Sequence, residues 1–339
     1  MKPITIIGGG LAGLALGNAL QRAGVAVTLH EAGTLPRHRV CGEFICGRGA
    51  NALAELGLST SLDGCALHRS TQWSIGNREI LQADLPAQAS GISRHLLDIR
   101  LANSFEHLGG VLRLNSRYRS SDSVEGIAFC NGRKAAESDW IGLKLHCTNL
   151  ETSADLELHL GDNGYVGLTA IERGRVNVCA LFKRIPRLKA SRENWLTTYL
   201  SATGLGDVAE RVVGGGIDPV SHCGVAGVQF SRIPERSQSK LKLGDAYSVI
   251  PPFTGNGMSI ALESAAVVFP LALRYAEGAM SWEQVCRAAD VAYAQRFNRR
   301  LKAARILHPF ISKRIGQTAL AGLSRCHLLP FNFLYHFTH

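Results

Sequence analysis

The chain has 339 residues, a net charge of +10 and an ordinary apolar content of 46%. This length is enough for a large buried core, arranged as one elaborate domain or two intertwined ones. No uninterrupted run of about 18 apolar residues occurs, which argues against a membrane-spanning helix. Glycines at positions 8, 9, 10 and 13 break the apolar N-terminus, which is therefore typical of a strand followed by a helix and not of a secretory signal.

Nine cysteines are scattered along the chain, and no Cys-x-x-Cys pair occurs. An odd number at irregular spacing argues against a disulfide framework or a zinc site, so we expect no bound metal and a reducing, cytoplasmic location. The positive charge has two interpretations. It attracts an anionic cofactor and substrate, or it contacts an acidic membrane surface. No nucleic-acid-binding motif accompanies it, so a nucleic-acid partner is not expected.

The first 31 residues predict a β-α-β unit. Residues 4–7 form an apolar run suited to a buried parallel strand. Leu11, Leu14, Ala15, Ala19 and Leu20 then recur at helical spacing. Gly24 ends this helix, and alternating apolar residues at 25–29 predict the second strand.

A glycine motif joins that strand and helix, with Gly8, Gly10 and Gly13 in the Gly-x-Gly-x-x-Gly pattern of dinucleotide-binding folds. The three glycines permit a tight turn, close approach to a pyrophosphate and close helix–strand packing. Residues 10–13, Leu11 and Ala12 included, open a helix whose free N–H groups bind phosphate. Glu31, which ends the second strand, is placed to accept hydrogen bonds from ribose hydroxyls. The motif alone does not choose between FAD and NAD.

The predicted secondary structure changes in the middle of the chain. Helices are predicted at residues 49–57 and 94–108. Short strands separated by turn residues are predicted at 141–147, 156–160, 165–171 and 176–182, as in an antiparallel meander. A strand-like run at 241–245 then precedes helices from about 257 and over 281–315. The aromatic-rich residues 331–339 give no clear prediction.

A second motif follows that strand-like run. It reads Gly244-Asp245-Ala246 and then Pro251-Pro252-Phe253-Thr254-Gly255-Asn256-Gly257-Met258. It resembles the second flavin-binding element of the flavoprotein superfamily that contains aromatic hydroxylases, geranylgeranyl reductases and flavin-dependent halogenases. The resemblance implies FAD as cofactor, with Asp245 on the ribityl chain. It also implies that Gly255, Gly257 and Met258 open a helix toward the flavin ring, where free N–H groups stabilise the charge of reduced flavin.

The resemblance covers residues 4–300 and implies further roles. Arg94 corresponds to an arginine that the family brings to the flavin phosphates, and Arg39 to a second arginine near the dinucleotide. The implied fold is α/β, a glutathione-reductase-like Rossmann FAD domain with an inserted antiparallel β-sheet and C-terminal helices. We assign residues 1–65, 90–138 and 225–300 to the FAD domain, 66–89 and 139–224 to the substrate-binding sheet, and 301–339 to a helical tail.

The sequence departs from each branch of the family. NAD(P)H is the electron donor that the resemblance implies, but Asn131-Gly132-Arg133 replaces the Asp-Gly element that supports reduction in the hydroxylases. The tryptophan motifs of halogenases and geranylgeranyl reductases are absent. Cys41-Gly42-Glu43 resembles a loop near the flavin in the reductases, so Cys41 and Glu43 are candidate catalytic residues. Burial would raise the pKa of Glu43 and suit it to acid–base chemistry, and Cys41 is a candidate thiolate of low pKa.

Three functions remain open. The first is a monooxygenase that hydroxylates an aromatic or polyketide-like small molecule through a flavin hydroperoxide. The second is a reductase of double bonds in an isoprenoid or lipid-like substrate. The third is a flavin-binding protein without turnover, which the intact cofactor motifs disfavour.

Overall fold

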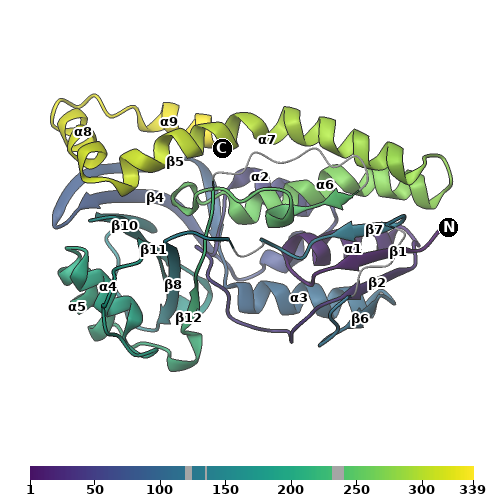
Figure 1. The fold of residues 1–339 in the computed structure, drawn as a ribbon, viewed down its shortest axis with the longest axis horizontal. Coiled ribbons are helices and arrows are strands. Elements are labelled where there is room, and N and C mark those ends of the chain that lie inside the picture. The colour runs from purple at the N-terminus through teal and green to yellow at the C-terminus, as the bar shows by residue number, and fades with distance from the viewer. Residues whose placement is uncertain (119–123, 134–135, 231–239) are drawn as a thin grey trace.

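A computed structural model describes residues 1–118, 124–133, 136–230 and 240–339. Two sheets stand side by side, and a layer of helices runs over both (Figure 1). The domain ranges 90–138 and 225–300 expected from the sequence extend into positions outside these described residues. The expected boundary after residue 89 lies within strand β5, and the one after residue 300 lies within helix α7.

Sheet A is parallel and has the strand order β13-β7-β1-β2-β6. Its strands are β1 (Ile4–Ile7), β2 (Val27–His30), β6 (Val111–Arg113), β7 (Ile127–Phe129) and β13 (Leu241–Lys242). Helix α1 (Leu11–Arg22) connects β1 to β2, which confirms the β-α-β unit. The strands β7 and β13 come from later segments, so this sheet is assembled from separated parts of the chain.

Helices cover sheet A and form with it the largest hydrophobic core among the described residues. They are α2 (Gly47–Glu55), α3 (Arg94–His107), α6 (Gly257–Ala276) and α7 (Trp282–Ser312), together with α1. The helices predicted at 49–57 and 94–108 are confirmed within two residues at each end. The α1 helix packs against α3 and α6, and α7 continues past sheet A to the far end of the molecule (Figure 1).

By length and composition alone, α6 is long and apolar enough to cross a membrane. In the fold it packs against α1, α2 and α7. Its buried Glu263 binds Arg300 through two hydrogen bonds of 2.8 Å and Arg296 through a third. A buried carboxylate that is paired in this way belongs to a protein core, so α6 is a core helix here.

Sheet B has the strand order β12-β8-β11-β10-β9-β4-β5-β3, and its neighbours are antiparallel except β4 and β9. The strands are β3 (Phe44–Ile45), β4 (Ala66–Ile75), β5 (Arg78–Gly91), β8 (Trp140–Cys147), β9 (Leu156–Gly161), β10 (Gly164–Ala170), β11 (Val176–Lys183) and β12 (Cys223–Val225). The four strands predicted between 141 and 182 are confirmed. Together the two sheets confirm the expected α/β class, with one parallel pairing in the otherwise antiparallel sheet.

The two faces of sheet B pack against different parts of the molecule, because successive side chains along a strand point to opposite faces. On β11, Val178, Ala180 and Phe182 face a small core under α4 (Trp195–Ala202) and α5 (Gly206–Gly214). Leu181, between two of them, faces the opposite side, where α7 and α8 (Arg314–Arg325) cover the sheet. This opposite face is the one that borders the cavity described below.

The C-terminal segment is helical. The helix predicted at 281–315 is divided at Lys313, where α7 ends and α8 begins. The aromatic-rich end forms α9 (Phe331–Thr338), which packs on α7. The remaining short turns are 3-10 helices at Ser59–Leu62, Glu172–Gly174, Pro219–Ser221, Gly244–Ala246 and Pro252–Thr254.

Candidate active site and cofactor cleft

A cavity of about 1230 Å³ lies between the two sheets and extends under the C-terminal helices. Pockets that hold one small molecule span about 300–1,000 Å³. This cavity therefore has room for a cofactor and a substrate together. Residues predicted from both flavin motifs line its wall, including Gly8, Gly10, Leu11, Ala12, Glu31, Arg39, Arg94, Asp245, Gly255, Gly257 and Met258.

The glycine motif shapes one end of the cavity. Gly8 has a φ of +111°, and a Cβ there would lie 2.3 Å from the carbonyl oxygen of Cys130. A Cβ on Gly13 would lie 2.1 Å from the Gly8 carbonyl oxygen. Gly10 instead borders open space, since no described atom lies within 4 Å of a Cβ built there. Gly10 also caps α1 without a side-chain hydrogen bond, so the N–H groups of the first turn remain available to an anion.

Glu31 lies directly after β2 and is buried at the cavity wall. Its Oε2 accepts a hydrogen bond from the Gly9 N–H at 2.8 Å, and its Oε1 accepts one from the Gly33 N–H at 2.9 Å. The Arg37 guanidinium adds a third contact at 3.1 Å. The carboxylate is thus held rigidly at the strand end, where a dinucleotide fold meets the ribose.

Two arginines share one carboxylate on the cavity wall. Arg94 begins α3 and donates two hydrogen bonds of 2.8 Å to Asp98. Burial opposes the charge of Arg94, but Asp98 outweighs it and raises the Arg94 pKa. The Nε of Arg39 lies 3.3 Å from Asp98 Oδ2. Burial, and then the charge of Arg94, lower the pKa of Arg39.

Arg39 has unmet hydrogen-bonding capacity at this wall. Its Nε and one Nη atom are buried and make no hydrogen bond within the described part of the chain, and their contacts are ion pairs of 3.3 Å to Asp98 and 3.9 Å to Glu31. Buried donors of this kind are normally satisfied. A guanidinium at a cavity wall with free donors suits a phosphate, which accepts them in pairs.

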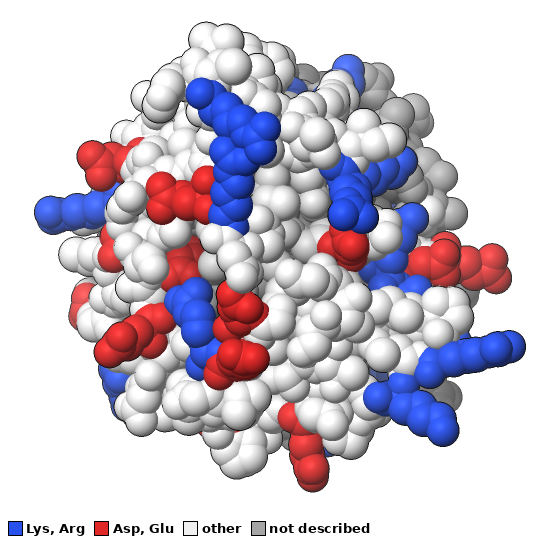
Figure 2. Space-filling view, turned by 90° about the vertical axis from the view of Figure 1, so that its left-hand side faces the viewer, with Lys and Arg blue, Asp and Glu red and all other residues white. Residues whose placement is uncertain are grey.

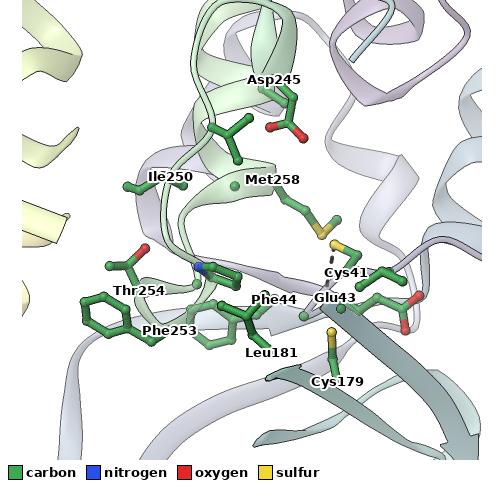
Figure 3. A pocket seen from close by; sticks show the side chains of 18 of the residues that line it. Cys41, Glu43, Phe44, Cys179, Leu181, Asp245, Ile250, Phe253, Thr254 and Met258 are labelled. Atoms are coloured by element: carbon green, nitrogen blue, oxygen red, sulfur yellow. Dashed lines mark hydrogen bonds between the residues drawn. The ribbon is translucent and has the colours of Figure 1, made fainter. Parts of the chain in front are cut away.

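The second motif forms the opposite wall (Figure 3). Asp245 points into the cavity, where it is exposed, and the partial loss of hydration between the cavity walls raises its pKa. Gly255 has a φ of +69°, and a Cβ there would lie 2.6 Å from the ring of Phe44. Gly257 and Met258 start α6 beside the cavity, and the N-terminus of α6 has no side-chain cap. Its first N–H groups are therefore open to a ligand.

The segment that departs from the hydroxylase pattern also reaches the cavity. Asn131, Gly132 and Arg133 follow the carboxyl end of β7 and line the wall. Arg133 donates hydrogen bonds to the carbonyl oxygens of Gly227 and Ala226, at 3.1 and 3.2 Å. This position therefore carries a cation that connects the segment after β7 to the 226–227 loop.

Glu43 differs from the sequence-based expectation. Its backbone has a φ of +55°, and its carboxylate points away from Phe253 and Met258 (Figure 3). Oε1 lies 3.1 Å from Lys144 Nζ, and Oε2 lies 2.6 Å from His146 Nε2. Burial alone would raise the pKa of Glu43, but these contacts outweigh it and the pKa is lowered. The expectation of a raised pKa is wrong, because the sequence did not show the two basic partners.

Cys41 also differs from its expectation. Its enclosure by the surrounding protein raises the pKa of the thiol, against the opposing charge of Arg94. The sulfur accepts a hydrogen bond from the Glu43 N–H, and Asn177 donates one to the Cys41 carbonyl oxygen. The predicted low-pKa thiolate is therefore wrong. The Cys41 loop forms cavity wall beside the two predicted flavin motifs.

Beyond these polar walls the cavity becomes an apolar chamber. Its side chains come from sheet B, the 252–254 turn and the C-terminal helices, and include Trp73, Leu158, Leu181, Phe253, Ile311 and Phe331. Tyr165 accepts a hydrogen bond from the Phe253 N–H at 3.2 Å, which fixes the turn against sheet B. The chamber therefore suits an aromatic or apolar molecule.

The sequence did not reveal the charged partners of Glu43, which lie far from it in the chain. Lys144 and His146 alternate on β8 and share one face of that strand. Their spacing indicates that this face of β8 is polar, but it does not indicate that Glu43 contacts both side chains. Asp98, the common partner of both arginines, stands in the α3 sequence one turn after Arg94. That i, i+4 pairing was readable from the sequence.

Comparisons with solved structures identify the fold. PqsL of Pseudomonas aeruginosa, solved with 2-aminobenzoylacetate, matches with a TM-score of 0.76 at 14% identity, over 95% of this chain and 98% of PqsL. HpxO of Klebsiella pneumoniae, solved with FAD and uric acid, matches with a TM-score of 0.75 at 16% identity, over 99% of this chain and 96% of HpxO. The chain has the fold of these flavoproteins.

A third structure, FqzB, matches with a TM-score of 0.76 at 18% identity, over 99% of this chain and 91% of FqzB. PqsL has been described as "a probable FAD-dependent monooxygenase". No protein-family model and no curated protein sequence matches this chain. The shared architecture therefore rests on structure, and it covers nearly the full length of both partners.

Proposed function

We propose that this protein is an FAD-dependent monooxygenase acting on an aromatic or apolar small molecule. The observation that carries the proposal is the continuity of the cavity. It leads from the glycine motif and Glu31, past Asp245 and the start of α6, into the apolar chamber. A cofactor bound in the first part would present its reactive end to a substrate in the second.

The residues present fit FAD. Gly10 leaves open space at the start of α1, where a side chain would intrude on a pyrophosphate. Arg39 has buried donors that make no hydrogen bond within the described residues, which suits a phosphate site. Gly255 brings its loop against Phe44, and the uncapped start of α6 offers N–H groups to the pyrimidine side of a flavin.

The chain's own residues bind, orient and exclude water. Glu31 and Asp245 would hold the ribose and the ribityl chain, and Arg39 and Arg94 the phosphates. Phe253 and Leu181 border the apolar chamber, which keeps water from the reacting atoms. FAD, when bound, supplies the activation of molecular oxygen. Glu43 positions the 41–44 loop through Lys144 and exchanges no proton with the substrate.

The structural neighbours support the choice of a monooxygenase over a reductase. One of them carries that description, and their bound compounds are aminobenzoylacetate and uric acid. A reductase that used the Cys41 thiol is disfavoured, because burial raises the thiol pKa. NAD(P)H is the proposed electron donor. The nine unpaired cysteines support a reducing cytoplasmic location, and the positive charge supports contact with an acidic membrane surface.

Oxygen labelling tests the proposal. The purified, FAD-loaded chain is reduced with NADH, NADPH or dithionite and then mixed with a panel of aromatic and apolar compounds under labelled oxygen gas. A monooxygenase places one labelled oxygen atom in the product. A product that gains two hydrogens and no label would establish the reductase instead. A protein that binds no flavin after reconstitution would refute both.

A further inference from the structure

The charge of this chain is concentrated at its C-terminal end. Residues 291–339 contain eight Lys and Arg residues and no Asp or Glu, so this segment accounts for +8 of the net +10. Arg296 and Arg300 bind Glu263, and Arg305 binds the Phe230 carbonyl oxygen. The five others, Arg299, Lys302, Lys313, Arg314 and Arg325, are exposed to solvent.

Exposed apolar side chains are concentrated in the same segment. Eight of the fifteen large hydrophobic side chains exposed among the described residues fall within 291–339. Single exposed apolar residues are ordinary, but a cluster marks an interaction surface. In Figure 2, which views the end of the molecule bearing α8, Lys and Arg side chains stand in the upper part of the surface, with acidic side chains beside the lower part of one such group.

The cations and apolar residues share one face of α7. Arg299, Lys302, Ile306 and Phe310 recur at intervals of three and four, which places them on one side of the helix, and Lys313 follows directly after its end. Ile306 is 68% exposed and Phe310 is 46% exposed. Basic and apolar side chains in one stripe are typical of helices that lie in a membrane interface.

Helices α8 and α9 also carry exposed apolar side chains. Ile315, at the start of α8, is 87% exposed, and Phe333 on α9 is 62% exposed. The Arg299 guanidinium lies 5.0 Å from the ring centre of Phe337 and donates a hydrogen bond to the His336 carbonyl oxygen. These contacts fasten α9 beside the stripe of α7. We call the surface formed by Arg299, Lys302, Ile306, Phe310, Lys313, Ile315, Leu323, Leu328, Phe333 and Phe337 the C-terminal face.

The cavity reaches the C-terminal face. Phe310, Leu323 and Pro330 line the cavity and are exposed to solvent. Farther in, Ile311 and Leu320 continue an apolar lining toward sheet B. The mouth of the chamber is therefore surrounded by apolar side chains, with cations around them.

We propose that the C-terminal face docks on the surface of an anionic phospholipid bilayer, and that an apolar substrate enters the chamber from the lipid between α7 and α8. The apolar side chains insert among the lipids, and the cations bind the headgroups. A second copy of the chain fits this face poorly, because pairing would bring two cationic surfaces together. The substrate route rests on the proposed function, whereas the docking does not.

Vesicle binding tests the docking. The FAD-loaded full chain is mixed with vesicles of phosphatidylcholine alone, or of equal parts phosphatidylcholine and phosphatidylglycerol, and bound protein is measured by flotation. Binding should be strong only with the anionic lipid. Lys302→Glu and Lys313→Glu should each weaken it about fivefold or more. Ile315→Glu and Phe333→Glu, which do not line the cavity, should each weaken it at least about tenfold.

Matched controls lie elsewhere on the surface. Val220→Glu changes a side chain that is 74% exposed in the 219–221 turn beside β8, and Lys189→Glu reverses a distant exposed cation. Both should bind vesicles as the wild type does. The docking proposal is overturned if no vesicle binds the wild type, if the controls lose binding equally, or if sedimentation shows a dimer that Ile315→Glu dissociates.

Dye uptake tests the entry route without any turnover. The protein is incubated with anionic vesicles that contain the apolar dye diphenylhexatriene and is then released by high salt, which screens the headgroup contacts. Released wild-type protein should carry the dye. Leu323→Arg, which places a charge in the mouth, should lower dye uptake at least about tenfold, the effect of a charge in an apolar path. Equal uptake by this variant would overturn the route and leave the monooxygenase proposal untouched.

Discussion

Replacement of Glu43 by Gln distinguishes a structural carboxylate from a reacting one. Glu43 and Lys144 are both fully buried, with Nζ and Oε1 3.1 Å apart. Gln removes the negative charge and leaves the ammonium group buried without its counter-charge. Loss of one partner of a buried ion pair costs about 3–5 kcal/mol. Since neither group is exposed, solvent screening does not reduce this figure, and we expect Glu43→Gln to lower the free energy of unfolding by that amount.

The assay is urea unfolding of the FAD-saturated protein, with turnover measured per bound flavin. The double variant Glu43→Gln/Lys144→Met removes both charges and should recover most of the lost stability. Turnover per bound flavin should stay close to the wild-type value in both variants. The reasoning is refuted if Glu43→Gln keeps wild-type stability but loses about tenfold or more in rate, the usual effect of removing an acid–base group.

Acid titration checks the same pair independently. In the folded protein the pKa of Glu43 lies below its ordinary value of 4.5. Burial raises this pKa, but the contacts with His146 and Lys144 lower it by more than burial raises it. The stability that Glu43 contributes is therefore complete above about pH 4.5 and is lost as the pH falls through the folded pKa. The double variant should lose less stability than the wild type over this acidic range, and parallel curves would contradict the assignment.

Three further predictions concern the cofactor walls and the thiols. Glu31→Ala and Asp245→Ala should each weaken FAD binding by about 1.5–3 kcal/mol in fluorescence titrations, and unchanged binding in both would refute their roles. Gly255→Ala, at a φ of +69° and 2.6 Å from the Phe44 ring, should cost about 1–3 kcal/mol of stability, unlike Gly206→Ala in open space. Thiol titration of the denatured, unreduced protein should find nearly all nine cysteines, and Cys41 should not react faster than an ordinary thiol at neutral pH. Several missing thiols, or rapid labelling of Cys41, would contradict this.

The cofactor end of the molecule was predictable because its constraints are local. Gly8 and Gly13 are required by backbone contacts within a strand–turn–helix of a few residues, and that pattern is visible in the sequence. The strands β9, β10 and β11 were predictable for a similar reason, since a short turn joins each to the next. In both cases the residues that make the structure are neighbours in the chain.

The chemistry of the 41–44 loop was not predictable in the same way. Glu43 is buried, and burial alone raises a carboxyl pKa. The sign of the result is set by Lys144 and His146, which lie more than one hundred positions away in the sequence. The sequence of the 41–44 loop is the same whether its buried carboxylate is unpaired or ion-paired. Only the pairing of β8 with its neighbours brings the basic residues to this place.

The C-terminal helix shows why the substrate is harder to infer than the cofactor. The α9 helix has eight residues, too few to be stable in isolation, so its sequence carries little helical signal. It is held by burial of Phe331 and Tyr335 and by a 2.6 Å hydrogen bond from Asn256 Nδ2 to the Thr338 carbonyl oxygen. Asn256 belongs to the flavin motif, so one residue connects the cofactor wall to the roof of the substrate chamber. The cofactor site can thus be read from short motifs, whereas the chamber exists only where sheet B, α7 and α9 meet.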